Sequence, residues 1–155
     1  MNTILIPTDF SVNSLRLVNQ ALENRKEEQT DVLLLYAHQL TDSITDLLFF
    51  SKTRTLRALS NPDFDEACSI LKNKFEGTLN SIRTDLFMGF TQQAFNRYLE
   101  SNKVSAIYLP ENKSIKMDRL ILKFAKRSKV DLIYIELPEI NIPFRASPST
   151  QLFRL

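Results

Sequence analysis

Short apolar runs alternate along the chain with longer segments that have helical periodicity. The apolar runs predict five strands, at 4–7, 32–36, 82–88, 104–109 and 132–137. Three consecutive leucines in the second run are typical of a strand that is buried on both faces. The third run alternates apolar and polar residues, which indicates a less enclosed strand near the edge of a sheet. This alternation predicts an α/β fold, a parallel sheet with helices on both faces.

Apolar residues that recur every three or four positions predict helices between these strands. The first covers 13–25 with Ser11 as its N-cap, and the second begins at Pro62 after Asn61. A third begins at Thr91, and a fourth covers 116–128. Cys68 lies on the apolar side of the helix that begins at Pro62, so we interpret it as an inert core thiol.

Two segments do not follow the alternation. In 43–60, which we interpret as a variable insert between the second strand and the next helix, Ser43 and Asp46 can form a capping box before the apolar residues 47–50. Four consecutive large apolar residues spread over more of a helix surface than the single face that usually packs on a core. We favour a helix pressed deep into the core; the alternative is a subunit contact or a lid over the ligand edge.

The chain ends in a segment broken by prolines. We predict one α/β domain over 1–138, followed by a C-terminal tail over 139–155 that is either a wrapping arm or a frayed end. A length of 155 residues fits one domain of ordinary soluble composition.

Charge and cysteine content narrow the partners and the compartment. The chain has 20 Lys and Arg against 18 Asp and Glu, which is too balanced to indicate nucleic acid. The predicted helix over 116–128 does carry a basic face, which we interpret as solvated: Lys116, Arg119, Lys123, Lys126 and Arg127. A single cysteine excludes an internal disulfide and fits a reducing compartment. With neither an N-terminal leader nor a long apolar run, we expect a cytoplasmic protein without a membrane partner.

The inventory of catalytic residues is small. The only histidine, His38, follows the second strand, and one histidine forms neither a multi-histidine metal site nor a recognisable Ser-His-Asp arrangement. We interpret His38 as a partly exposed loop residue, and we predict a protein that is not an enzyme and holds no metal. Asp9 follows the first strand next to a helix start, where it would either bind a ligand or accept N–H bonds within the turn.

The opening segment resembles a known family. Residues 4–11, which read Ile-Leu-Ile-Pro-Thr-Asp-Phe-Ser, followed by Ser14 and the helix end at 21–22, are similar to the start of a universal stress protein domain. Residues 34–38 resemble that family's second strand, and Gly89 stands where the family often has a glycine. With 104–109 and 132–138, the likeness covers about residues 2–138.

The resemblance implies a five-stranded sheet in the order 3-2-1-4-5, often dimeric through its last strand. In nucleotide-binding members, the aspartate that matches Asp9 and the backbone at Ala37 contact ATP, and a glycine motif after strand four holds the phosphates. This chain has only two glycines, neither of them beyond residue 89. At the place of the motif, Pro110 has no N–H to donate and Glu111 repels phosphate.

We therefore expect no cofactor, with ATP binding of the family's usual kind disfavoured. A degenerate nucleotide pocket remains a candidate site, with six residues: Pro7, Thr8, Asp9, Ala37, Lys113 and Ser114.

Two hypotheses follow for function. The leading one is a non-catalytic binding or regulatory protein of the stress response, a homodimer that acts through a protein partner or a small ligand. The alternative is an ATP- or AMP-binding protein or slow ATPase that uses the degenerate pocket. A phosphoacceptor receiver is less favoured because no aspartate follows the third strand and no lysine the fifth. A flavodoxin-like carrier is the least favoured, because the chain has no tryptophan and no evident flavin sandwich.

Overall fold

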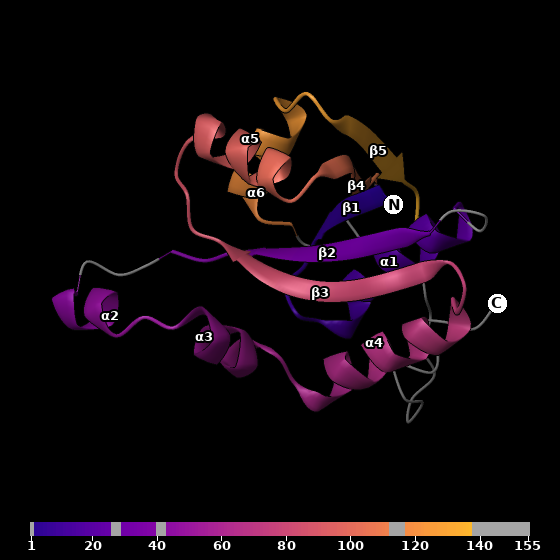
Figure 1. The fold of residues 1–155 in the computed structure, drawn as a ribbon, viewed down its shortest axis with the longest axis horizontal. Coiled ribbons are helices and arrows are strands. Elements are labelled where there is room, and N and C mark those ends of the chain that lie inside the picture. Colours follow the sequence, from indigo (N-terminus) through magenta and orange to yellow (C-terminus); the bar gives the residue numbers. More distant parts are fainter. Residues whose placement is uncertain (1, 26–28, 40–42, 112–116, 138–155) are drawn as a thin grey trace.

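Five parallel strands form one sheet in the computed structural model, which describes residues 2–25, 29–39, 43–111 and 117–137. The strands are β1 (Asn2–Pro7), β2 (Thr30–Ala37), β3 (Leu79–Phe87), β4 (Val104–Pro110) and β5 (Asp131–Ile135). Their order is β3-β2-β1-β4-β5 (Figure 1). The α/β class, the order and the edge position of the third strand are as predicted.

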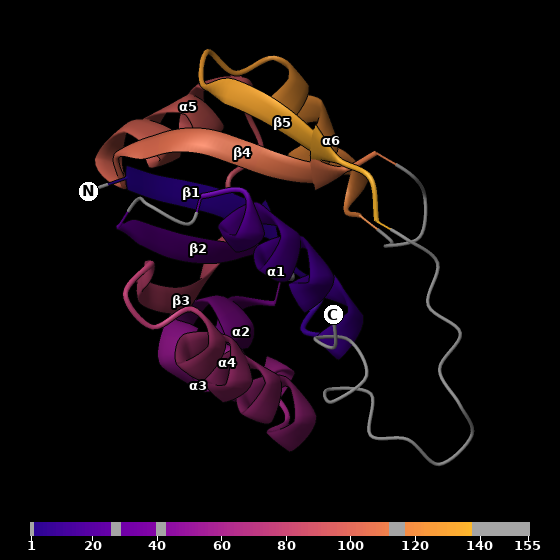
Figure 2. The same ribbon diagram turned by 90° about the vertical axis from the view of Figure 1, so that its right-hand side faces the viewer.

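Helices cover both faces of the sheet. One face carries a 3₁₀ turn η1 (Val12–Ser14), α1 (Leu15–Glu23) and α4 (Pro62–Lys74), and the other carries α5 (Gln92–Ser101) and α6 (Arg119–Lys126). In Figure 2, α1 lies on the near side of the sheet and α5 on the far side. Between β2 and α4 the chain forms two short helices, α2 (Ile44–Leu48) and α3 (Lys52–Leu59).

The central strands are buried on both faces. Successive residues of a strand point to opposite sides, so Leu34 joins the core under α1 and α4, while Leu33 and Leu35 join the core under α5 and α6. All three leucines have no exposed surface. The prediction made from three consecutive leucines is confirmed.

The predicted helix starts are mostly confirmed by their capping bonds. The side chain of Ser11 accepts a bond from the Ser14 amide, that of Asn61 from the Phe64 amide, and that of Thr91 from Ala94. The fourth predicted helix differs, because it begins at Arg119 after the N-cap Asp118 and not at Lys116, which lies outside the described residues.

The segment 43–60, here called the arm, departs most from prediction. None of the residues of α2 is buried, and Ile44, Leu48 and Phe49 each expose about three-quarters of their surface. Our preferred interpretation, a helix pressed deep into the core, is wrong. The reason lies in the layout: α2 lies beyond the ends of β2 and β3, past the sheet that would have covered it (Figure 1).

Candidate functional site

The turn after β1 is held by a network of short bonds. Thr8 donates its amide to the Leu35 carbonyl at 2.9 Å, and its hydroxyl pairs with that of Ser14 at 2.8 Å. The same hydroxyl accepts the Phe10 amide at 3.0 Å. Thr8 is therefore a structural residue of this turn, tied to both β2 and the helix start.

Phe10 fixes the path of the chain through the turn. It has a φ of 62°, in the left-handed region that non-glycine residues seldom adopt, yet its side chain is only 3% exposed. Its ring packs between those of Tyr36 and Phe64, with centroids at 5.5 and 5.2 Å. Asn61 also donates its side-chain amide to the Phe10 carbonyl at 3.0 Å. The burial of one ring thus holds a strained backbone at the carboxyl edge of the sheet.

Asp9, next to Phe10, is exposed. Its Oδ1 accepts both the amide of Ser11, at 2.9 Å, and the hydroxyl of Ser11. Of the two roles considered for Asp9, the structure supports acceptance of bonds within the turn. Binding of a ligand by Asp9 remains a prediction.

A cavity of about 260 Å³ opens beside this turn, at the carboxyl ends of β1 and β2. Its lining residues come from the ends of these two strands, from the turn after β1, and from the start of α6 and the segment that leads into it: Pro7, Thr8, Asp9, Leu35, Tyr36, Ala37, Met117, Asp118 and Ile121. Four of the six predicted site residues thus meet at one cavity. The other two, Lys113 and Ser114, lie outside the described residues. We call this space the β1–β2 cavity.

Asp118 is the charged lining residue that sequence reasoning missed. It is the N-cap of α6, and its Oδ1 accepts the amides of Leu120 and Ile121 at 2.9 and 3.1 Å. A carboxylate of the chain itself therefore occupies the amides that a helix start offers to anions. An aspartate directly before an apolar helical stripe is an N-cap signal, and the sequence contained it.

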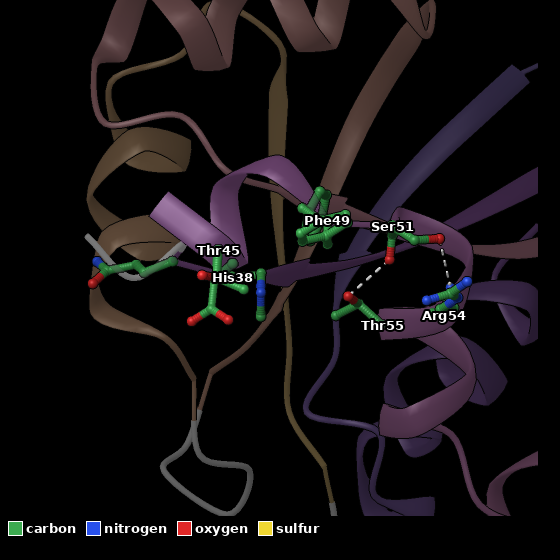
Figure 3. Close-up of a pocket in the computed structure, with 9 residues that line it drawn as sticks. His38, Thr45, Phe49, Ser51, Arg54 and Thr55 are labelled. Atoms are coloured by element: carbon green, nitrogen blue, oxygen red, sulfur yellow. Dashed lines mark hydrogen bonds between the residues drawn. The ribbon is translucent and has the colours of Figure 1, made fainter. Parts of the chain in front are cut away.

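A second cavity, of about 370 Å³, lies between the end of β2 and the arm (Figure 3). Its lining runs from the end of β2 into α3: His38, Gln39, Thr45, Asp46, Phe49, Phe50, Ser51, Arg54 and Thr55. The ring of His38 stacks on that of Phe50, with centroids 5.8 Å apart. His38 is half-buried, and it lines this second cavity, not the β1–β2 cavity.

The base of the arm is tied to the edge of the sheet. Lys52, the first residue of α3, forms an ion pair of 2.8 Å with Asp85 of β3, and Tyr98 of α5 donates to the other oxygen of Asp85 at 2.7 Å. Burial acts to raise the pKa of Asp85, but the bonds from Lys52 and Tyr98 outweigh it and leave that pKa below its ordinary value. Burial and the nearby carboxylate raise the pKa of Tyr98.

Two further observations concern chemistry. Burial raises the pKa of the Cys68 thiol to about 11, as the interpretation of an inert thiol requires. Within the part of the chain that the structure describes, we find no group of three or more His, Cys, Asp or Glu side chains arranged to hold a metal ion. Among the helices described there, none has the length and apolar character needed to cross a bilayer.

Several solved structures share this fold. The crystal structure of a hypothetical protein is 21% identical, with a TM-score of 0.53, and the match covers 90% of this chain and 99% of that one. A universal stress protein from Archaeoglobus fulgidus is 13% identical, with a TM-score of 0.52 over 88% and 94% of the two chains. A universal stress protein in complex with cAMP is 16% identical, with a TM-score of 0.51 over 87% and 96%. No curated protein sequence matches the chain.

The strand order and the helices on both faces define a Rossmann-like α/β sandwich, the fold that these structures share. The family model for the universal stress protein family matches residues 1–123. The chain belongs to the universal stress protein family.

Proposed function

We propose that this protein is a non-catalytic binding or regulatory module of the stress response in the cytoplasm, a homodimer whose β1–β2 cavity takes a small ligand without phosphate. The observation that carries this proposal is the position of Asp118. Its carboxylate caps α6 and lines the same cavity as the carboxylate of Asp9. Two negative charges at one small cavity disfavour a phosphate there, and a neutral or cationic ligand group suits them better.

The chemistry of the nucleophiles and bases supports a non-catalytic role. The single histidine is stacked on Phe50 in the other cavity, and one oxygen of Asp9 is already engaged by Ser11. The single cysteine, with a pKa of about 11, is a neutral thiol at physiological pH. Each of these side chains has a structural explanation.

The second candidate function is nucleotide binding, with or without slow ATP hydrolysis. It is favoured by one relative of the same fold, solved as a complex with cAMP, and by the fact that Pro7, Thr8, Asp9 and Ala37 line one cavity. A nucleotide would have to place its phosphates away from Asp118. Lys113 and Ser114 are the candidates for holding them.

Calorimetric titration of nucleotide-free protein separates the two candidates. We expect no heat from Mg-ATP, because its phosphates would meet the carboxylate of Asp118 at the start of α6. Micromolar binding of Mg-ATP, or nucleotide that copurifies with the protein, would contradict the proposal and establish the second candidate.

A matched pair of variants tests the role of Asp118 directly. Asn caps helices as well as Asp does, so Asp118→Asn removes the charge and keeps the cap. We expect the ratio of the affinity for AMP to the affinity for adenosine to rise about two- to fivefold in this variant. That range corresponds to about 0.3–1 kcal/mol, the effect of one charge at a helix start. Asp63→Asn, an exposed acid in the first turn of α4, is the control and should leave the ratio unchanged.

A further inference from the structure

The second cavity lies apart from the β1–β2 cavity and shares no described lining residue with it. It lies between the end of β2 and the two helices of the arm: in Figure 3, His38 and Thr45 lie on one side of the space and Arg54 on the other. Its volume of about 370 Å³ is within the range of small-molecule sites. A ligand here would be additional to the one proposed for the β1–β2 cavity.

Aromatic rings form much of the apolar part of the lining. The ring of His38 stacks on that of Phe50 at an interplanar angle of 24°, and it also neighbours the ring of Tyr36, with centroids 6.5 Å apart. These contacts fix the positions of the His38 and Phe50 rings. Phe49 adds a further ring and exposes 74% of its surface. Because aromatic rings stack favourably on other flat rings, this wall suits a planar aromatic ligand.

Polar groups of the lining are available to a ligand. Within the described chain, neither the imidazole of His38 nor the guanidinium of Arg54 forms a hydrogen bond or an ion pair. Asp46, the acid of the described lining, already has an interaction of its own. The hydroxyl of Thr55 is also engaged, because it donates to the Ser51 carbonyl at 2.9 Å. The available groups therefore include a permanent cation, which favours an anion.

A carboxylate is the anion that these groups suit best. The guanidinium of Arg54 presents its N–H donors in a fork that matches the two oxygens of a carboxylate. One arginine balances one negative charge, whereas the second charge of a phosphate monoester would meet the carboxylate of Asp46 in the same lining. We propose that the second cavity binds an aromatic carboxylate, with its ring against Phe49 and its carboxylate on Arg54.

The walls of the cavity are held in place before any ligand binds. Lys52, two residues before Arg54 in α3, is paired with Asp85 of β3 at 2.8 Å. At the other wall, the amide of His38 donates to the Phe87 carbonyl at 3.0 Å. The arm and the end of β2 are therefore both tied to β3. A preformed site loses less conformational entropy on binding, which favours a small ligand.

The single histidine is a probe of this cavity. Proton NMR of the full chain shows the carbon-bound imidazole protons of His38 without overlap from another histidine. We expect cinnamate to shift these signals saturably, and its uncharged counterpart cinnamamide to bind about two- to fivefold more weakly, the effect of one exposed ion pair. No saturable shift, or equal affinities for the two compounds, would overturn the proposal. Tighter binding of phenyl phosphate than of cinnamate would overturn the choice of a carboxylate.

Two variants of α3 separate the role of Arg54 from a general attraction of anions. Arg54→Gln should reduce the affinity for cinnamate to that for cinnamamide and leave the affinity for cinnamamide unchanged. Arg57→Gln is the matched control, because Arg57 is an exposed arginine of the same helix outside the described lining. It should change neither affinity. Equal losses in the two variants would overturn the proposal.

A further variant tests the aromatic wall. Phe49→Leu should weaken the binding of both compounds about two- to tenfold, the effect of one aromatic pair. Phe90→Leu is the control, because Phe90 is 67% exposed and lies outside the described lining. Unchanged binding in Phe49→Leu would contradict the placement of the ligand ring. Failure of these tests would leave the proposal for the β1–β2 cavity standing, because that proposal rests on Asp9 and Asp118.

Discussion

At the scale of single residues, Phe10 explains how the turn after β1 keeps its shape. A residue with φ of 62° is strained, and such strain persists only where the surroundings enforce it. Here the enforcement comes from Tyr36 and Phe64 on either side of the ring and from the Asn61 bond to the carbonyl. One buried ring therefore connects β2 and α4 to the turn that carries Thr8 and Asp9.

This arrangement predicts a large loss of stability for Phe10→Ala. Truncation of a buried phenylalanine costs about 3–5 kcal/mol, and we expect this range because the ring has only 3% exposure. Urea unfolding measures the change. Phe90→Ala is the matched control: Phe90 is 67% exposed, so the same truncation there should cost less than about 0.5 kcal/mol. Similar losses for both would show that the Phe10 ring does not hold the turn.

At the scale of secondary-structure elements, Asp85 joins three of them. Its carboxylate lies on β3 and binds both Lys52 of α3 and Tyr98 of α5. The carboxylate is almost buried, whereas the Lys52 side chain is 47% exposed. The arm is therefore attached to the sheet through one charged group, and the ionisation of that group affects the stability of the fold.

Asp85→Asn should destabilise the protein in a pH-dependent way. The pKa of Asp85 is lowered in the folded state, so its stabilising effect is present above the ordinary aspartate pKa and is lost as pH falls through the lowered value. We expect a difference of about 1.5 kcal/mol in unfolding free energy at pH 7, at the low end for bonds to charged groups because Lys52 is partly exposed. The difference should shrink in acid, as followed by urea unfolding.

Glu100→Gln on α5 is the control for this prediction, because that carboxylate is exposed. It should change the unfolding free energy little at any pH. A gap for Asp85→Asn that stays the same from neutral to acid pH would contradict the assigned role of the charge.

The elements also show which features a sequence can reveal. Leu33, Leu34 and Leu35 predicted a doubly covered strand because consecutive apolar residues of a strand must face both sides. The caps at Ser11, Asn61 and Thr91 were readable because a cap depends on residues within one turn of chain. Asp118 carried the same local signal. The predicted helix nevertheless began too early, at Lys116, because Met117 fits its apolar stripe and Lys116 its basic face.

The features that the sequence did not predict depend on position in the fold. The apolar residues 47–50 predicted burial, yet nothing local shows that α2 lies beyond the end of the sheet. A positive φ at Phe10 has no signal either, since glycine and asparagine are the residues expected there. The meeting of Asp118 with Asp9 at one cavity depends on the start of α6 lying at the carboxyl ends of β1 and β2, which are distant from it in the sequence.

At the scale of the whole molecule, β5 leaves one edge of the sheet open. It pairs only with β4, so its outer backbone groups have no strand partner in the described chain, and Tyr134 is 47% exposed beside them. An unpaired edge strand is a template for a second strand. A homodimer formed through β5 of two copies is therefore our proposal for the assembly, and a two-fold contact suits it because both copies offer the same edge.

Sedimentation at several protein concentrations tests this assembly. We expect dimers at micromolar concentration, and we expect Tyr134→Lys to shift them towards monomers, since a lysine on an edge strand opposes strand pairing. Phe49→Lys is the matched control, because it places the same charge on an exposed aromatic position of the arm. If Phe49→Lys dissociates the dimer and Tyr134→Lys does not, the arm is the subunit contact. A monomer at every concentration would exclude the dimer and leave β5 as an unpaired edge.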